Sequence, residues 1–224
     1  MTGTVVVVSG GLDSAVLAYK ARKQHEGPLH LLSFDYGQRH KRELECAAKI
    51  AKALDAKHDI INLTDLRALL KGSSLTDDAI DTPHGHYAAE SMKLTVVPGR
   101  NAIMLSIAWG VAVSEGADRV GIGVHSGDHF IYPDCRPEFI YAMRNALAAG
   151  TADMSGYTKE IWTPFLSLTK ADIVVEGAIH GVPFEDTWTC YEGGDVHCGK
   201  CGSCVERREA FAEAGVADPT EYAS

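Results

Sequence analysis

Near its start the chain has a continuous β-branched run at residues 4–8, one threonine and four valines, which ends at a Ser-Gly-Gly turn. A continuous run of this kind is typical of a strand that is buried on both faces of a sheet. Apolar residues then recur at helical spacing over residues 12–25, and a Gly-Pro pair closes this predicted helix. The N-terminal pattern therefore predicts a strand, a tight turn and a helix in succession.

The same alternation continues along the rest of the chain. Further strands are predicted at residues 29–34, 60–63, 118–124 and 160–165. Further helices are predicted at residues 38–54, 100–115, 136–149, 170–180 and 203–214. Residues 72–98 are rich in Gly, Ser, Asp, His and Pro, so we expect a long irregular connection. Strands that alternate with helices predict a doubly wound, mainly parallel α/β sheet with helices on both faces.

Composition narrows the class of protein without changing this fold. A chain of 224 residues, 46% apolar and 23% charged, has the size of one large α/β domain with at most a small appendage. The formal net charge of −9 argues against direct binding of nucleic acid. No apolar run is long enough to span a membrane, and Met1 leads into the first strand without a basic leader. We therefore expect a cytoplasmic protein.

Four of the six cysteines lie close together near the C-terminus: Cys190, Cys198, Cys201 and Cys204. In a chain without a predicted secretion signal, such spacing indicates a metal site rather than disulfides. Four thiolates suit one structural zinc, and an iron–sulfur cluster is the main alternative. His197 is interpreted as a non-ligand, because four sulfurs complete the set. We place a boundary near residue 186, with an α/β domain at 1–186 and a zinc region with a final helix at 187–224.

The turn after the first strand has the features of an anion-binding loop. Gly10 and Gly11 would let the backbone approach a phosphate closely, and Ser9 and Ser14 could donate their hydroxyls. The free N–H groups and the dipole of the following helix favour an anion at this point. Asp13 would hold Mg²⁺ or cap the helix. An ordinary strand-to-helix turn is the alternative, and the string is neither a Walker A loop nor a Rossmann fingerprint.

The string Ser-Gly-Gly-Leu-Asp-Ser resembles the pyrophosphate loop of the N-type ATP pyrophosphatases. Residues 34–40, 97–101 and 132–136, with the cysteine spacing, sharpen this likeness. Together they resemble the 7-cyano-7-deazaguanine synthase family over nearly the whole chain. The resemblance implies an adenine nucleotide α-hydrolase-like fold and an ATP-dependent carbon–nitrogen ligase. It also implies bound zinc, ATP with Mg²⁺ as co-substrate, and a homodimer.

The reaction that the resemblance implies converts 7-carboxy-7-deazaguanine and ammonia into 7-cyano-7-deazaguanine. It proceeds through an adenylated carboxylate and an amide, in queuosine-type tRNA base biosynthesis. A related enzyme that couples the adenylated acid to an amine on a protein or other partner is the alternative. A tRNA-thiolating enzyme would need a basic RNA-binding surface, which the net charge of −9 disfavours. A non-enzymatic ATP sensor would need no pocket for a second ligand.

Candidate site residues follow as hypotheses. By resemblance, the nucleotide segment comprises Val8, Ser9, Gly10, Gly11, Leu12, Asp13, Ser14, Ala15, Val16, Leu17 and Ala18. Asp13, Arg100 and Lys170 are predicted to be catalytic, the last two because each begins a helix where a phosphate or adenylate could bind. Alternatives are a surface position for Arg100 and a role outside the site for Lys170.

Substrate contacts are predicted at His129, Tyr132, Asp134 and Arg136. The Asp134 carboxylate could accept from a guanine-like N–H edge, and Arg136 could pair with the substrate's carboxylate. The alternative for the last two is a proline-containing turn that Asp134 caps. Cys135 could act as a nucleophile, but adenylation makes this unnecessary, and a lone cysteine is more often a buried apolar residue.

Overall fold

The computed structural model describes residues 3–87, 90–152, 154 and 160–223. Within these residues one parallel sheet runs in the order β3-β2-β1-β4-β5. Its strands are β1 (Thr4–Val7), β2 (Leu29–Asp35), β3 (Lys57–Asn62), β4 (Arg119–Gly121) and β5 (Glu160–Trp162). The strand order reverses beside β1, which confirms the predicted doubly wound α/β fold.

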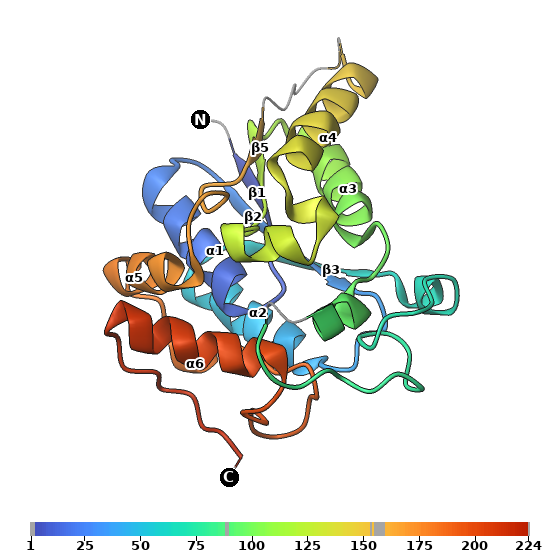
Figure 1. Ribbon diagram of the computed structural model, residues 1–224. Helices are drawn as coiled ribbons and strands as arrows, with labels where there is room; N and C mark the ends of the chain where they lie inside the picture. The colour runs from blue at the N-terminus through green and yellow to red at the C-terminus, as the bar shows by residue number, and fades with distance from the viewer. Residues whose placement is uncertain (1–2, 88–89, 153, 155–159, 224) are drawn as a thin grey trace.

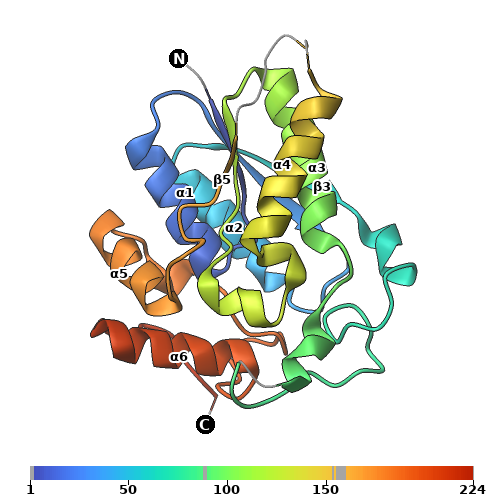
Figure 2. The same ribbon diagram turned by 45° about the horizontal axis from the view of Figure 1, so that its top comes forward.

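Helices cover both faces of this sheet (Figures 1 and 2). They are α1 (Leu12–Gln24), α2 (Arg42–Ala53), α3 (Arg100–Glu115), α4 (Pro137–Gly150), α5 (Lys170–His180) and α6 (Gly202–Ala214). In both views α6 lies beside α5 at the edge of the molecule (Figures 1 and 2). None of the helices formed by the described residues is both long and apolar enough to cross a membrane.

The central strand β1 divides the hydrophobic core into two parts. Val5 and Val7 pack with α3, whose Trp109 is almost completely buried. Val6 and Val8 face the other side and pack with α1, α2 and α5. Because β1 is buried on both faces, apolar residues are favoured on both sides of the strand, and this explains the continuous valine run that follows Thr4.

Three strands differ most from the predictions: β4 and β5 each end three residues earlier than predicted, and β3 begins three residues earlier. The prediction placed a strand at 60–63, whereas β3 begins at Lys57 and pairs with β2 through Asn62. As an edge strand it is largely exposed, so its polar first half carries no hydrophobic signal. Helix α2 begins at Arg42 rather than 38, and the Gln38 side chain donates instead to Phe34 O at the end of β2.

Candidate active site

A cavity opens at the carboxyl ends of β1 and β4, the point where the strand order reverses. Its empty volume is about 1100 Å³, which includes space open to solvent. In open α/β sheets this position is where ligands bind. The three residues predicted to be catalytic, Asp13, Arg100 and Lys170, all line it. Trp188, Thr189, Tyr191 and Ser203 line it from the cysteine-rich part of the chain.

The loop after β1 is held by its own serine and by α2. Ser14 Oγ accepts hydrogen bonds from the backbone N–H groups of Ser9 at 3.2 Å and Gly10 at 3.3 Å, and donates to Gly11 O at 3.0 Å. Gly10 has a φ of +94°, and a Cβ at this position would lie only 1.9 Å from Glu43 O. Glycine is therefore required at position 10 by the close approach of α2 as well as by the backbone angle.

The predicted nucleotide segment divides between the cavity and the core. Val8, Ser9, Gly11, Leu12, Asp13 and Ser14 line the cavity. The residues from Ala15 to Ala18 are fully buried and pack in the core on the α1 side of the sheet. Their assignment as nucleotide contacts stays a prediction. The structure gives these four residues a packing role, because they hold the helix whose N-terminus faces the cavity.

Lys170 lies between two carboxylates at the cavity wall. Its Nζ is 2.6 Å from Asp13 Oδ2 and 3.3 Å from Glu206 Oε2. Burial by itself would lower the pKa of the Lys170 ammonium, but Asp13, Glu206 and Asp128 raise it above its ordinary value. Burial would raise the pKa of the Asp13 carboxyl, but Lys170 and His125 lower it overall. Both partners therefore stay charged at neutral pH.

Glu206 was missed by the sequence analysis. It belongs to α6 and begins the charged stretch Glu-Arg-Arg-Glu, which by its pattern predicts an exposed helix face. Only the packing of α6 beside α5 brings its carboxylate to Lys170, at the start of α5. Its place two residues after Cys204 gave no indication of this contact.

A compartment of tyrosines forms the other end of the cavity. We define the tyrosine compartment as Arg100 with Tyr36, Tyr87, Tyr132 and Tyr191, all of which line the cavity. Arg100 Nη1 donates to Tyr36 Oη at 3.3 Å, and its guanidinium carbon lies 5.8 Å from the ring centroid. Burial raises the pKa of Tyr36 to about 12, although Arg100 opposes this. The compartment therefore presents neutral phenols around one cation.

The Tyr-Pro-Asp-Cys-Arg string is tied to the beginning of α3. Asp134 Oδ2 accepts from the Asn101 backbone N–H at 3.1 Å, so Asp134 caps this helix. Tyr132 and Cys135 line the cavity, whereas the cavity lining drawn from the described residues does not include Asp134. Burial raises the pKa of the Cys135 thiol, which keeps it protonated.

His129 and Arg136 contact each other at the edge of this string. Arg136 Nε donates to the His129 backbone oxygen at 2.8 Å, and the described cavity lining contains neither residue. The structure thus brings Tyr132 to the cavity and leaves the other three predicted substrate residues outside its lining. Their substrate roles stay predictions.

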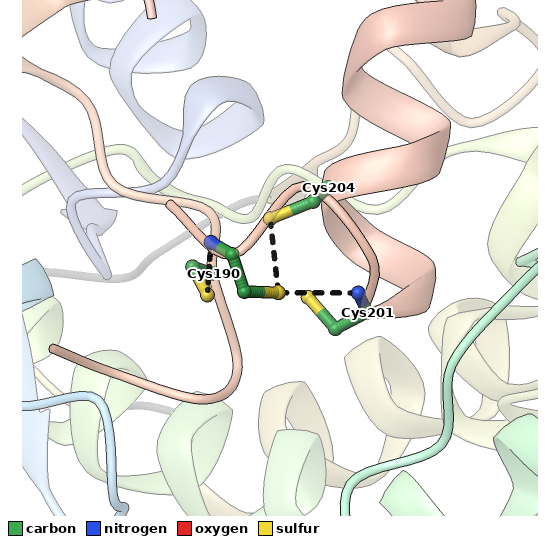
Figure 3. Close-up of side chains that lie close together, drawn as sticks. Cys190, Cys201 and Cys204 are labelled. Carbon is green, nitrogen blue, oxygen red and sulfur yellow. Dashed lines mark hydrogen bonds between the residues drawn. The ribbon is translucent and has the colours of Figure 1, made fainter. Parts of the chain in front are cut away.

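The four cysteines near the C-terminus converge on one small space, and Figure 3 shows three of them, Cys190, Cys201 and Cys204. The Sγ atoms of Cys190, Cys198, Cys201 and Cys204 all lie within 4.8 Å of one another. A tetrahedral site with metal–sulfur distances of about 2.3 Å has sulfur–sulfur edges of about 3.8 Å, so the set is close to what a metal needs. His197 Nε2 accepts from the Thr189 backbone N–H at 3.1 Å instead of joining the cluster. The cluster could therefore hold one metal through four sulfurs.

Backbone N–H groups also point at these sulfurs. Cys198 N donates to Cys190 Sγ at 3.3 Å, and Cys201 N donates to Cys198 Sγ at 3.2 Å. Such bonds stabilise thiolates, the form in which cysteine binds a metal. The donor set fits zinc and iron–sulfur ligation alike.

These features define a class: an α/β protein with a glycine- and serine-containing loop at the cavity after its central strand, and with four cysteines that could hold a metal. Two solved structures share the fold. NMN synthetase from Francisella tularensis is 13% identical with a TM-score of 0.53, over 96% of this chain and 78% of that chain. The U34-tRNA thiolase NcsA from Methanococcus maripaludis, with its [4Fe-4S] cluster, is 15% identical with a TM-score of 0.51, over 95% of this chain and 64% of that chain.

The family follows from sequence comparison. The family described as "Queuosine biosynthesis protein QueC" matches residues 3–215, and the chain belongs to it. Relatives named 7-cyano-7-deazaguanine synthase are 57% identical in Sinorhizobium fredii and 56% identical in Ruegeria pomeroyi. These matches cover 98% of this chain and 91% and 94% of the relatives, respectively. The predicted family is thus confirmed, and the chain is an enzyme.

Proposed function

We propose that this enzyme makes 7-cyano-7-deazaguanine from 7-carboxy-7-deazaguanine, ATP and ammonia, in queuosine-type tRNA base biosynthesis. The names of its relatives support the product. One observation carries the reaction: a single cavity joins the loop at residues 9–14 and Lys170 to the tyrosine compartment. An ATP triphosphate and a planar aromatic acid would therefore meet in one place.

The chemistry requires such a meeting. A carboxylate does not react usefully with ammonia at neutral pH, because resonance shields its carbon and the leaving group would be oxide. Transfer of AMP from ATP to the carboxylate releases pyrophosphate and gives an adenylate, which ammonia attacks to form the amide and AMP. A second adenylation, at the amide oxygen, then allows loss of AMP and two protons to give the nitrile. Positioning and charge stabilisation supply most of the rate in reactions of this kind.

The cavity residues suit these steps. The Lys170 ammonium and the N-terminus of α1 would attract the pyrophosphate part of ATP. Asp13 Oδ1 is buried and accepts no hydrogen bond from the described residues, so a carboxylate oxygen is available for Mg²⁺. When bound, Mg²⁺ would neutralise the charge of the leaving pyrophosphate. The Arg100 guanidinium would attract the substrate's carboxylate or the adenylate, among phenols that remain uncharged.

Three further proposals accompany this function. The metal of the cysteine cluster is zinc, with a structural role, because four sulfurs leave no open position for a reacting group. The family resemblance supports a homodimer, and we also propose that the enzyme is cytoplasmic. Metal analysis of the purified protein and light scattering in solution test the first two.

The decisive experiment is incubation with ATP, Mg²⁺, ammonia and 7-carboxy-7-deazaguanine, followed by mass analysis. We expect the nitrile, AMP and pyrophosphate. Accumulation of the amide alone would favour the alternative in which the adenylated acid is coupled to another amine. The turnover of the Asp13→Ala variant should fall about 10³-fold, and the variant should keep the metal of the cysteine cluster. Asp65→Ala, at an exposed position of a short 3-10 helix, is the matched control and should keep full turnover.

A further inference from the structure

One carboxylate from the cysteine-rich part of the chain, that of Glu206, lies beside the proposed nucleotide loop. Glu206 lies on α6, whereas Lys170 begins α5 and Asp13 belongs to the first turn of α1. The three side chains meet at the Lys170 ammonium, 2.6 Å from Asp13 Oδ2 and 3.3 Å from Glu206 Oε2. We propose that Glu206 is a positioning residue, which holds Lys170 at the cavity wall and moderates its attraction for pyrophosphate.

Burial makes this contact matter. The side chains of Glu206 and Lys170 are only 12% and 13% exposed. Because water is largely excluded, the interaction of the two charges is screened far less than that of an exposed surface pair. Lys170 and Asp13 line the cavity, but the described lining does not include Glu206. Glu206 therefore acts on a ligand by holding Lys170 and through the electrostatic field of its own carboxylate, without touching the ligand.

The fold holds Glu206 rigidly in place. It follows Cys204 by one turn or less of α6, so the metal cluster fixes the beginning of its helix. Its neighbour Arg207 is fully buried and donates to Thr187 Oγ1 at 2.8 Å and to Phe184 O at 3.1 Å. The same helix that completes the metal site thus sets the position of the cation beside the loop.

The sign of the effect follows from the charges. One ammonium lies between two carboxylates. Burial raises the pKa of the Glu206 carboxyl and Lys170 opposes this rise, and with both carboxylates ionised the group of three carries a net negative charge. Replacing Glu206 by glutamine removes one negative charge and should strengthen the binding of any anion at the loop. The same replacement removes one of the two groups that hold Lys170, so the ammonium is placed less accurately and turnover should fall.

The test uses these opposite directions. In Glu206→Gln we expect the Kd for pyrophosphate with Mg²⁺, measured by titration calorimetry, to fall about tenfold. We expect kcat to fall about tenfold, while the KM for ATP does not rise. Glu206→Asp, which keeps the charge, should remain near the parent enzyme in both measurements. Glu213→Gln, the same substitution at an exposed position of α6, should change neither.

Two results would overturn the proposal. One is a Glu206→Gln variant that equals Glu213→Gln in both pyrophosphate affinity and kcat. The other is a variant in which both quantities fall together with metal content, which a purely structural role predicts. The inference rests on the proposed function for its use of pyrophosphate, but the binding measurement needs no deazapurine. Tighter pyrophosphate binding without any nitrile product would therefore sink the proposed function and leave the role of Glu206 standing.

Discussion

The sheet with its helices and the cysteine-rich part of the chain are stabilised in different ways. Two large apolar clusters pack against opposite faces of the sheet. The four-cysteine region, residues 187–223, has only a small apolar cluster, in which Trp188 and the cysteines pack with Cys46 of α2. Beyond its first turns α6 packs into the sheet's core through Phe211. We propose that the boundary at residue 186 marks a change from apolar to metal stabilisation rather than an independent folding unit.

This difference matters because the active-site cavity lies across the two regions. The nucleotide loop belongs to the sheet, and Trp188, Tyr191 and Ser203 supply the opposite wall. The Trp188 backbone N–H donates to Gly10 O at 2.9 Å, which joins the wall directly to the loop. None of the four cysteines is among the described cavity-lining residues, but a metal that they hold would still control whether the cavity forms.

Removing the metal should have the largest effect. A structural metal held by four thiolates contributes on the order of 10 kcal/mol to folding, more than the small apolar cluster around it. We expect the Cys201→Ser variant to lose the metal, and its turnover should fall below detection. The far-UV circular dichroism should stay unchanged, because the sheet remains folded. Cys46→Ala, a buried cysteine outside the metal set, is the control and should keep the metal. Full turnover in the metal-free variant would contradict the claim that the metal stabilises the cysteine-rich wall of the cavity.

Substitution of Gly10 tests the contact between the loop and α2. A Cβ here would lie 1.9 Å from Glu43 O and 2.8 Å from Ala47 N, which are backbone atoms that cannot turn away. We expect Gly10→Ala to lower the free energy of unfolding by about 3 kcal/mol, from strain and displacement of α2 together. Gly72→Ala is the matched control, since Gly72 has a similar φ of +89° and no atom within 4 Å of its Cβ position. Urea unfolding measures both, and equal losses would refute the steric argument.

Alkaline pH should weaken the tyrosine compartment, which both regions build. Burial raises the pKa of Tyr36 from 10.0 to about 12, and the pKa values of Tyr87 and Tyr191 are raised well above 10.0. A tyrosine whose pKa is raised in the folded state stabilises that state fully below pH 10. This stabilisation is lost as the pH rises toward 12. For Tyr36 the loss is about 2 kcal/mol in the free energy of unfolding. Unfolding can be measured between pH 9 and 11, with tyrosinate absorbance as the probe of ionisation. The free energy of unfolding should fall less steeply with pH in Tyr36→Phe than in the parent chain.

The smallest expected effect is at Asp134, inside the sheet part of the molecule. Loss of its hydrogen bond to the Asn101 N–H should cost about 1 kcal/mol in Asp134→Ala and less in Asp134→Asn, which keeps an acceptor. Because the described cavity lining does not include Asp134, we expect the KM for the deazapurine acid to stay unchanged. A rise of about tenfold in that KM would instead support the substrate role predicted from sequence.

Local patterns in the sequence were sufficient for much of the fold. The valine run of β1 and the bounds of α3 (Arg100–Glu115) and α5 (Lys170–His180) agree with the predictions, because each depends on neighbours a few residues away. Strand β3 (Lys57–Asn62) was placed too late, because an exposed edge strand needs no apolar alternation and is defined by its pairing with β2. The spacing of the cysteines indicated a metal centre for the same local reason.

What the sequence by itself determined was therefore the succession of strands and helices along the chain, the loop at residues 9–14 and the four cysteines that could hold a metal. Only the tertiary structure decided which distant side chains share the cavity. It placed Glu206 at Lys170, brought Tyr36 and Tyr191 together, and gave Asp134 a helix to cap. Local preferences act over a few residues, whereas these contacts depend on how the crossover helices pack across the sheet, and no pattern along the chain records that packing.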